Sequence, residues 1–250
     1  MISVVTFKWK PKPGYRSHFM SGHVNVMRNM VERHYRKPHR FLCVTDDPVG
    51  LDPRIEVVPL WNDHASVPNP TWPDGPSCYR RLKVFSRGFA KIAGPRFVCI
   101  DLDAVIVNDL TPLWDRTEPF LIFKSHIPSI PVCGSMFMMD AGSQAFVWDD
   151  FNPTTSPALS SKAGCRGSDQ GWMAYCYRHR PVPGWGNSEG VYSYMELAPK
   201  QRPRGRPQRT IVPNSGPLPT DARIVFFTGK PDPWDHVAKT QSPWIDEHYR

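Results

Sequence analysis

Strand-like apolar runs alternate with segments of helical spacing along the first half of this chain. The runs occupy Ile2–Phe7, Phe41–Val44, Ile55–Leu60 and Arg96–Ile100, and the helical spacing covers Ser17–Tyr35, with Ser17 as candidate N-cap, and Ser77–Ile92. Further strands are expected at Phe120–Phe123, Ser135–Met139 and Arg223–Phe227, with a helix at Ser168–Arg178. Parallel strands need a long crossover connection, which a helix supplies, so this alternation predicts an α/β fold whose central sheet has parallel character.

Composition narrows the class of protein. A length of 250 residues is the size of one domain, and 28 prolines predict long ordered loops, above all over residues 180–219. The net charge of +8 favours a polyanionic partner, such as nucleic acid or a nucleotide-derived ligand. No feature of the sequence indicates an obligate protein partner.

Missing motifs exclude several classes. The chain has no Gly-x-Gly-x-x-Gly fingerprint and no Walker loop, which argues against a dinucleotide oxidoreductase and a P-loop NTPase. The six cysteines include no Cys-x-x-Cys pair, so a structural zinc site is not expected. No run of about eighteen apolar residues occurs, so we expect no membrane span. Together these features predict a cytoplasmic protein, in the host cytoplasm if the chain is viral.

Two aspartates, Asp101 and Asp103, directly follow the strand-like run Arg96–Ile100. Side chains at i and i+2 of an extended chain point the same way. Two like charges at the end of a buried strand need a cation or hydrogen bonds, and Mg²⁺ or Mn²⁺ bridging to a phosphate meets that need. Ligands of parallel sheets bind at the carboxyl ends of the strands, where this pair falls. Taken alone, the triplet also fits a strand-end turn with two solvated aspartates.

Six short motifs occur in a fixed order along the chain. They are Val44-Thr45-Asp46, Tyr79-Arg80-Arg81-Leu82-Lys83-Val84-Phe85, Asp101-Leu102-Asp103, Gly134-Ser135-Met136-Phe137-Met138-Met139, Ser168-Asp169-Gln170 and Phe227-Thr228-Gly229-Lys230-Pro231-Asp232-Pro233-Trp234. In this order the sequence resembles the GT-A glycosyltransferases of the glycogenin and lipopolysaccharide-galactosyltransferase type. The resemblance implies one GT-A domain over residues 1–250, with a mixed, mainly parallel sheet and long Pro-rich loops. It also implies a hexosyltransferase that uses a nucleotide-sugar donor, a UDP-sugar, together with Mn²⁺ or Mg²⁺.

The same resemblance implies roles for individual residues. Asp101 and Asp103 are expected to bind the metal that bridges the donor diphosphate, and Lys230 to hold the departing diphosphate. Asp169 and Gln170 are expected to line the donor-sugar and acceptor site as the catalytic pair, with Asp169 as the candidate general base. The expected donor-binding residues are Thr6 and Phe7, which meet the nucleoside, and Arg81, Lys83, Asp101, Gly134, Ser135, Gly229 and Lys230.

One residue of the family pattern is missing. Family members carry a histidine before the final glycine as a third metal ligand, whereas Phe226, Phe227 and Thr228 precede Gly229 here. His236 is the candidate replacement, and the alternative is a metal that keeps an additional water.

Each of these residues also has a structural interpretation when it is taken singly. A solvated helix face accounts for Arg81 and Lys83, and interaction with a helix dipole accounts for Asp169. Lys230 fits an ordinary turn, and His236 fits an ordinary surface position.

A basic, Pro-rich segment occupies residues 200–209. Its core, Pro203-Arg204-Gly205-Arg206-Pro207, resembles the AT-hook, whose arginines enter the narrow minor groove of A·T-rich DNA. We therefore expect Arg202, Arg204, Arg206 and Arg209 to contact DNA, with a solvated basic loop as the alternative.

The acceptor follows from joining these two resemblances. A phage-type DNA glycosyltransferase would add a sugar to a hydroxymethylated pyrimidine base, with Trp72, Trp185 and Tyr192 as candidates to stack on a flipped base. Two alternatives stay open. In the first, the enzyme transfers the sugar to a saccharide, a lipid-linked glycan or a protein. In the second, suggested by the missing histidine, the chain is an inactive GT-A scaffold that serves as a DNA-binding module.

Overall fold

The computed structural model describes residues 1–10, 18–68, 75–125, 127, 130–165, 167–197 and 217–250. Its strands are β1 Ile2–Lys8, β2 His39–Thr45, β3 Glu56–Pro59, β4 Arg96–Ile100, β5 Ala104–Ile106, β6 Phe120–Lys124, β7 Val132–Asp140, β8 Gly184–Trp185, β9 Val191–Ser193 and β10 Ile224–Phe226. Its α-helices are α1 Ser21–His34, α2 Ala90–Ala93, α3 Thr111–Trp114, α4 Phe146–Asp149, α5 Ser156–Lys162, α6 Asp169–Tyr177, α7 Tyr194–Leu197, α8 His236–Gln241 and α9 Trp244–His248. Three 3₁₀ segments complete the described elements: η1 Cys78–Phe85, η2 Arg87–Phe89 and η3 Asn187–Glu189.

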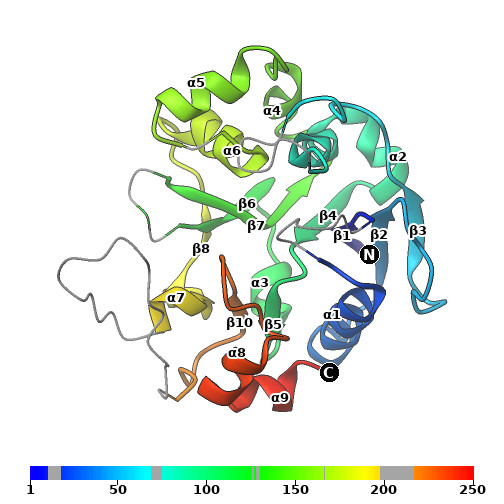
Figure 1. The fold of residues 1–250 in the computed structure, drawn as a ribbon, viewed down its shortest axis with the longest axis vertical. Helices are drawn as coiled ribbons and strands as arrows, with labels where there is room; N and C mark the ends of the chain where they lie inside the picture. Colours follow the sequence, from blue (N-terminus) through cyan, green and yellow to red (C-terminus); the bar gives the residue numbers. More distant parts are fainter. Residues whose placement is uncertain (11–17, 69–74, 126, 128–129, 166, 198–216) are drawn as a thin grey trace.

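A seven-stranded sheet of order β3-β2-β1-β4-β7-β6-β8 forms the centre of the molecule (Figure 1). β3, β2, β1 and β4 pair in parallel, β7 runs antiparallel to both β4 and β6, and β8 is parallel to β6. The register aligns Val5 with Leu42 and with Cys99. The carboxyl ends of β1, β2 and β4 therefore meet at one edge of the sheet, the carboxyl edge. The predicted mixed, mainly parallel sheet is confirmed.

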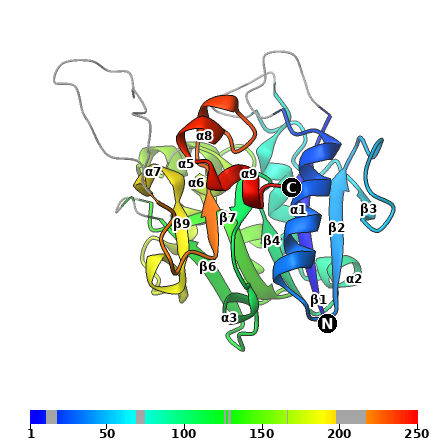
Figure 2. The same cartoon turned by 90° about the horizontal axis from the view of Figure 1, so that it is seen from below.

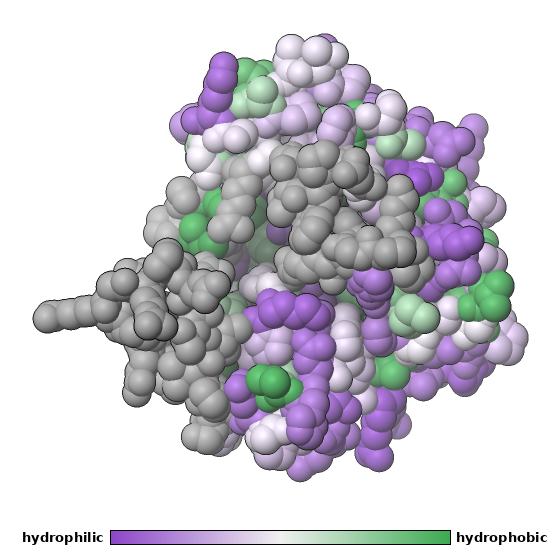
Figure 3. Space-filling model, in the orientation of Figure 1, coloured by the Kyte–Doolittle hydropathy of each residue, from purple (hydrophilic) through white to green (hydrophobic). Residues whose placement is uncertain are grey.

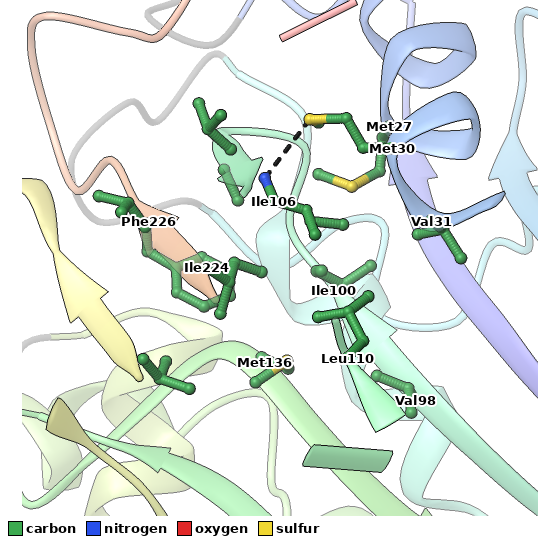
Figure 4. Close-up of a cluster of buried hydrophobic side chains, with 14 of the residues drawn as sticks. Met27, Met30, Val31, Val98, Ile100, Ile106, Leu110, Met136, Ile224 and Phe226 are labelled. Carbon is green, nitrogen blue, oxygen red and sulfur yellow. Dashed lines mark hydrogen bonds between the residues drawn. The ribbon is translucent and has the colours of Figure 1, made fainter. Parts of the chain in front are cut away.

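Helical segments cover both faces of this sheet. Alternate residues of one strand face opposite sides, so Val4 packs in a core with α1, whereas Val5 packs in a second core with η1 and α6. Figure 2, seen from below, shows α1 and α9 over the first of these faces. In the first core the Ile106 amide donates a hydrogen bond to Met30 Sδ at 3.4 Å, which joins β5 to α1 (Figure 4).

A three-stranded sheet of order β5-β10-β9 brings the C-terminal part of the chain to the carboxyl edge. β10 runs antiparallel to β5 and pairs Phe226 with Ala104. The Phe227 amide then donates to the Asp103 carbonyl at 2.8 Å. Figure 2 shows β10 running toward that edge and α8 lying there. Residues that follow β10 are thus placed beside the two aspartates.

The segment Ser77–Ile92 departs from its predicted single helix. It consists of η1, η2 and the short helix α2, and the extended backbone of Ser86 separates the first two. Tyr79, Leu82 and Phe85 are all buried at a spacing of three residues. That spacing lies on one face of a 3₁₀ helix, which has three residues per turn, as well as on an α-helix. The predicted N-cap Ser17 lies outside the described residues, and α1 has Met20 as its N-cap.

Short elements occupy part of the expected loop 180–219. β8, η3, β9 and α7 lie between residues 184 and 197, and each is too short to give a sequence periodicity. Trp185 in β8 is fully buried and its Nε1 donates to the Leu113 carbonyl at 3.1 Å. The prediction that Trp185 stacks on a DNA base is therefore wrong, because its ring fills the core.

Among the described segments, no helix combines the length and the apolar character needed to cross a membrane. Large hydrophobic side chains that are exposed include Met20, Val49, Leu159 and Val237. On the face shown in Figure 3, hydrophobic residues form separate spots among hydrophilic ones.

Close packing of β8 against β6 depends on a glycine. A Cβ at Gly184 would lie 2.0 Å from the Ile122 carbonyl oxygen, which is backbone and has little room to move. We expect Gly184→Ala to lower the free energy of unfolding by about 1–3 kcal/mol through overpacking. The control is Gly22→Ala in α1, where no atom lies within 4 Å and the change should stabilise by up to about 1 kcal/mol. Urea titration of both variants measures the difference, and equal stabilities would contradict it.

Candidate functional site

The two aspartates after β4 are held between β7 and β10. The Asp101 amide donates to the Ser135 carbonyl at 2.8 Å, and the Asp103 carbonyl accepts from Phe227. Both side chains are half-buried. Burial, opposed by hydrogen bonds from Ser135, raises the pKa of the Cys133 thiol to about 11, and both carboxylates add to that rise. Both negative charges therefore act on the same small region at the start of β7.

Arg81 of η1 is the central cation of this region. Its Nη2 lies 2.9 Å from Asp101 Oδ1 and donates to the Gly134 carbonyl at 3.0 Å, and its Nη1 lies 3.4 Å from Asp169 Oδ2. Burial alone would lower the pKa of Arg81, but Asp101 and Asp169 outweigh it and raise that pKa. The guanidinium also lies 5.8 Å from the centre of the Phe7 ring. One side chain thus links β1, β4, β7 and α6.

Asp169 is the first residue of α6 and its side chain is almost fully buried. Ser168 is the N-cap of this helix, and its hydroxyl accepts from the Gly171 amide at 3.1 Å. Burial raises the pKa of Asp169, while Arg81 opposes the rise. Gln170 follows and lies beside β7, where Cys133 Sγ donates toward Gln170 Oε1 over 3.9 Å.

Gly134 and Ser135 lie in β7 opposite these residues. A Cβ at Gly134 would lie 2.3 Å from Met173 Cε and 3.2 Å from Gln170 Cγ. The glycine therefore allows α6 to approach β7 closely, a role that the sequence did not reveal. Ser135 is buried, 3.3 Å from Cys133 Sγ. Donor contacts by both residues stay predictions.

The end of β1 forms the next part of the carboxyl edge. Thr6 is fully buried and its hydroxyl has no hydrogen-bond partner among the described residues, and Phe7 is 8% exposed. The buried Lys8 donates to the carbonyl of Asp47 at 2.6 Å and to its carboxylate at 2.7 Å. The sequence did not reveal the role of Lys8. A single lysine at the end of a strand-like run does not indicate that its partner is an aspartate 39 residues later.

A cleft of about 440 Å³ opens at the same edge. It is lined by Lys10, Asp46, Ala65, Gly75, Pro76, Ser77 and Arg80, which come from the segments after β1, β2 and β3 and from the start of η1. Its polar lining includes two cations and a carboxylate.

Lys83 does not join the Arg81 cluster. Its Nζ lies 2.6 Å from Asp63 Oδ2 and 5.4 Å from the centre of the Trp61 ring. Lys83 is thus tied to the loop after β3, and donor binding by it stays a prediction.

Gly229 and Lys230 follow β10. Gly229 has a φ of 104°, in the region that favours glycine. Lys230 pairs with the carboxylates of Asp232 and Asp235. Burial lowers the pKa of Lys230, but the interactions with Asp232 and Asp235 together outweigh burial and raise that pKa.

His236, the proposed third metal ligand, is exposed at the start of α8. Its Nε2 lies 3.4 Å from Thr240 Oγ1. Within the residues that the structure describes, no three His, Cys, Asp or Glu side chains group closely enough to hold a metal. The structure therefore does not bring His236 together with Asp101 and Asp103, and its ligand role stays a prediction.

The predicted DNA contacts Arg202, Arg204, Arg206 and Arg209, and the aromatic residue Trp72, lie outside the described residues. Tyr192 is described, and its hydroxyl donates to Asp221 Oδ1 at 2.9 Å.

The buried carboxylate of Asp169 and the half-buried one of Asp101 both depend on Arg81 for their charge balance. Arg81→Met should lower the free energy of unfolding at neutral pH by about 3–5 kcal/mol, since it leaves buried charge without a partner. The matched control is Arg87→Met, which removes the exposed pair with Asp149 and should cost less than about 1 kcal/mol. Urea unfolding of both variants tests this, and equal losses would contradict the assignment.

The loss of folding stability caused by Arg81→Met should also depend on pH. Burial raises the folded pKa of Asp169, so its ionised form opposes folding, and this cost is relieved as pH falls through the folded pKa. Removing Arg81 raises that pKa further. The stability gap between wild type and variant should therefore narrow as the pH is lowered from about 7.5 to about 5.

No protein-family model matches the sequence, and no curated protein does. Among solved structures, the galactosyltransferase LgtC in complex with donor and acceptor sugar analogues aligns with a TM-score of 0.60 and 14% identity, over 98% of this chain and 94% of that one. An LgtC active-site mutant, with glutamine changed to glutamate, aligns with the same TM-score and 13% identity, over 98% and 95%. The apo form of the glycosyltransferase GlyE from Streptococcus pneumoniae TIGR4 aligns with a TM-score of 0.53 and 10% identity, over 94% of this chain but only 56% of GlyE. The predicted fold class is thereby confirmed: this chain has the GT-A fold of LgtC.

Proposed function

We propose that this protein is a glycosyltransferase that moves a sugar from a nucleotide-sugar donor to an acceptor hydroxyl. The observation that carries the proposal is the cluster of Arg81, Asp101 and Asp169 at the carboxyl edge of a GT-A sheet. The diphosphate and the sugar of such a donor need different partners. A guanidinium pairs with phosphate oxygens, and carboxylates accept hydrogen bonds from sugar hydroxyls.

The structural neighbours support this proposal. LgtC is a galactosyltransferase whose solved structure holds donor and acceptor sugar analogues, and GlyE is a glycosyltransferase. The LgtC active-site mutant has a glutamine changed to glutamate, so the active site of LgtC contains a glutamine. The site proposed here also contains a glutamine, Gln170. We propose Asp169 and Gln170 as the catalytic pair and a UDP-sugar as the donor, on the sequence motifs that resemble the GT-A glycosyltransferases.

A divalent metal fits the residues that are present. Asp101 and Asp103 offer hard carboxylate oxygens from one strand end, and Mg²⁺ or Mn²⁺ is commonly held by one or two carboxylates plus substrate phosphates. The metal would neutralise the charge that grows on the departing diphosphate. Asp101, which also pairs with Arg81, and Asp103 are the residues that would hold the metal.

In the proposed reaction the bond from the anomeric carbon to the diphosphate oxygen breaks and a bond to the acceptor oxygen forms. The acceptor proton must leave, and a raised pKa makes Asp169 a better base than an ordinary aspartate. Arg81 and Lys230 contribute positive charge beside the leaving diphosphate. The cleft lined by Lys10, Asp46 and Ser77 lies at the end of β1, where Thr6 and Phe7 are predicted to meet the nucleoside.

The metal assignment predicts a loss of donor hydrolysis. Asp101→Asn combined with Asp103→Asn should lower Mn²⁺-dependent hydrolysis of a UDP-sugar by at least about 100-fold, as expected for removing electrostatic stabilisation of the leaving group. Asp149→Asn, on an exposed carboxylate paired with Arg87, is the control and should retain activity. Released UDP is the measured product. An active double variant would refute the metal assignment, and a wild type inactive on every nucleotide sugar would favour the inactive-scaffold alternative.

For the acceptor we propose DNA that contains a hydroxymethylated pyrimidine base. The basis is the charge of +8 and the AT-hook-like core Arg204-Gly205-Arg206. A saccharide, a lipid-linked glycan or a protein is the alternative.

The DNA proposal predicts a change in salt dependence. Arg204→Ala combined with Arg206→Ala should weaken DNA binding and reduce the slope of log K against log salt by about 2, because two phosphate-neutralising charges are lost. Mass spectrometry of hydroxymethylated DNA after incubation with a panel of nucleotide sugars tests transfer directly. An unchanged slope together with unmodified DNA would leave the alternative acceptors.

A further inference from the structure

The position of the Asp169 carboxylate depends more on the backbone at the start of α6 than on its ion pair with Arg81. The Asp169 side chain is 5% exposed, and within the described part of the chain its Oδ2 has no hydrogen-bond partner of good geometry. The nearest Arg81 nitrogen is 3.4 Å away, which is long for a charge-assisted hydrogen bond. The position of the carboxylate therefore depends on what holds the start of α6.

One tertiary hydrogen bond holds the residues that lead into this helix. The Tyr79 hydroxyl of η1 donates to the Gly167 carbonyl at 2.7 Å, and both residues are buried. The bonds that Ser168 makes at this helix start are local, since it accepts from the amides of Gly171 and Trp172. The Tyr79 bond ties the residue before this cap to a different element, η1.

Tyr79 is itself fixed by aromatic packing. Its side chain is fully buried, and its ring stacks on Phe151 at 5.0 Å with an interplanar angle of 30°. Phe151 meets the edge of Trp172, whose Nε1 donates to the Val147 carbonyl at 2.8 Å. A ring held in this way presents its hydroxyl in one direction.

The neighbours of Tyr79 in η1 reach the same carboxylate. The Cys78 thiol lies beside the Asp169 carboxylate, and burial keeps this thiol protonated by raising its pKa well above the usual value. Arg81 approaches from two residues further along. On the opposite side, Gly134 lets Gln170 lie close against β7. A shift of Gly167 away from η1 would therefore separate Asp169 from both of its partners.

We propose that Tyr79 is a positioning residue that holds Asp169 and Gln170 in register with Arg81. This inference rests on the proposed function, because it concerns the geometry of that same site. Tyr79 touches no substrate in this account and acts through the Gly167 carbonyl.

The test compares two buried tyrosines that both belong to the packing around α6. Tyr79→Phe removes the hydroxyl that holds the start of the helix and keeps the ring. Tyr177→Phe removes a hydroxyl at the other end of α6, which donates to Gln144 Oε1 at 3.1 Å. Both variants lose one hydrogen bond and keep their core ring, so a purely structural role predicts the same result for both.

Two measurements are made on wild type and both variants. Amide hydrogen exchange of the peptide from Gly167 to Trp172 should become about fivefold faster in Tyr79→Phe only. For hydrolysis of the donor that wild type uses, kcat should fall about tenfold in Tyr79→Phe, while KM stays within about twofold. Tyr177→Phe should match wild type in both kinetic constants.

The outcomes separate this inference from the proposed function. If wild type is active and the two variants share the same kcat, or if exchange at the helix start does not change in Tyr79→Phe, the inference is overturned and the proposed function stands. If wild type hydrolyses none of the nucleotide sugars, the proposed function is overturned, and the positioning role of Tyr79 in catalysis is overturned with it.

Discussion

The arrangement of this site depends on the contacts of one guanidinium. Arg81 meets Asp101 after β4, Asp169 at the start of α6 and the Gly134 carbonyl in β7. Carboxylates removed from water are stable only beside a positive charge or hydrogen-bond donors, so the two acidic groups can lie this close together because Arg81 lies between them. The planar fork suits this task, since its nitrogens reach separate acceptors at fixed angles, which a lysine ammonium on a flexible stem does not do.

Sequence reasoning succeeded where a local pattern decides the structure. The strand Arg96–Ile100 has its predicted bounds, because five consecutive apolar or amphipathic residues between a turn and two aspartates leave few alternatives. A helix was also expected over Ser168–Arg178, and α6 covers Asp169–Tyr177. The family resemblance implied one site for Asp101 and Asp169, and Arg81 contacts both carboxylates in the structure.

The remaining features arise from tertiary contacts that no local pattern encodes. The role of Gly134 depends on a helix that begins 35 residues later, and the burial of Lys8 depends on a carboxylate after β2. The 3₁₀ form of η1 was hidden because apolar residues three apart fit both helix types. The placement of His236 away from the aspartates follows from α8, whose position relative to β4 is set by the β5–β10 pairing.

That pairing has a consequence for the order in which the molecule is made. β10 is synthesised about 120 residues after β5, so a growing chain that holds Arg81, Asp101 and Asp169 still lacks the strand that flanks Asp103. Until the strand arrives, β5 presents an unpaired edge, and unpaired edges in nascent chains invite association with other chains. Closing the small sheet therefore completes the site and removes an aggregation hazard in the same step.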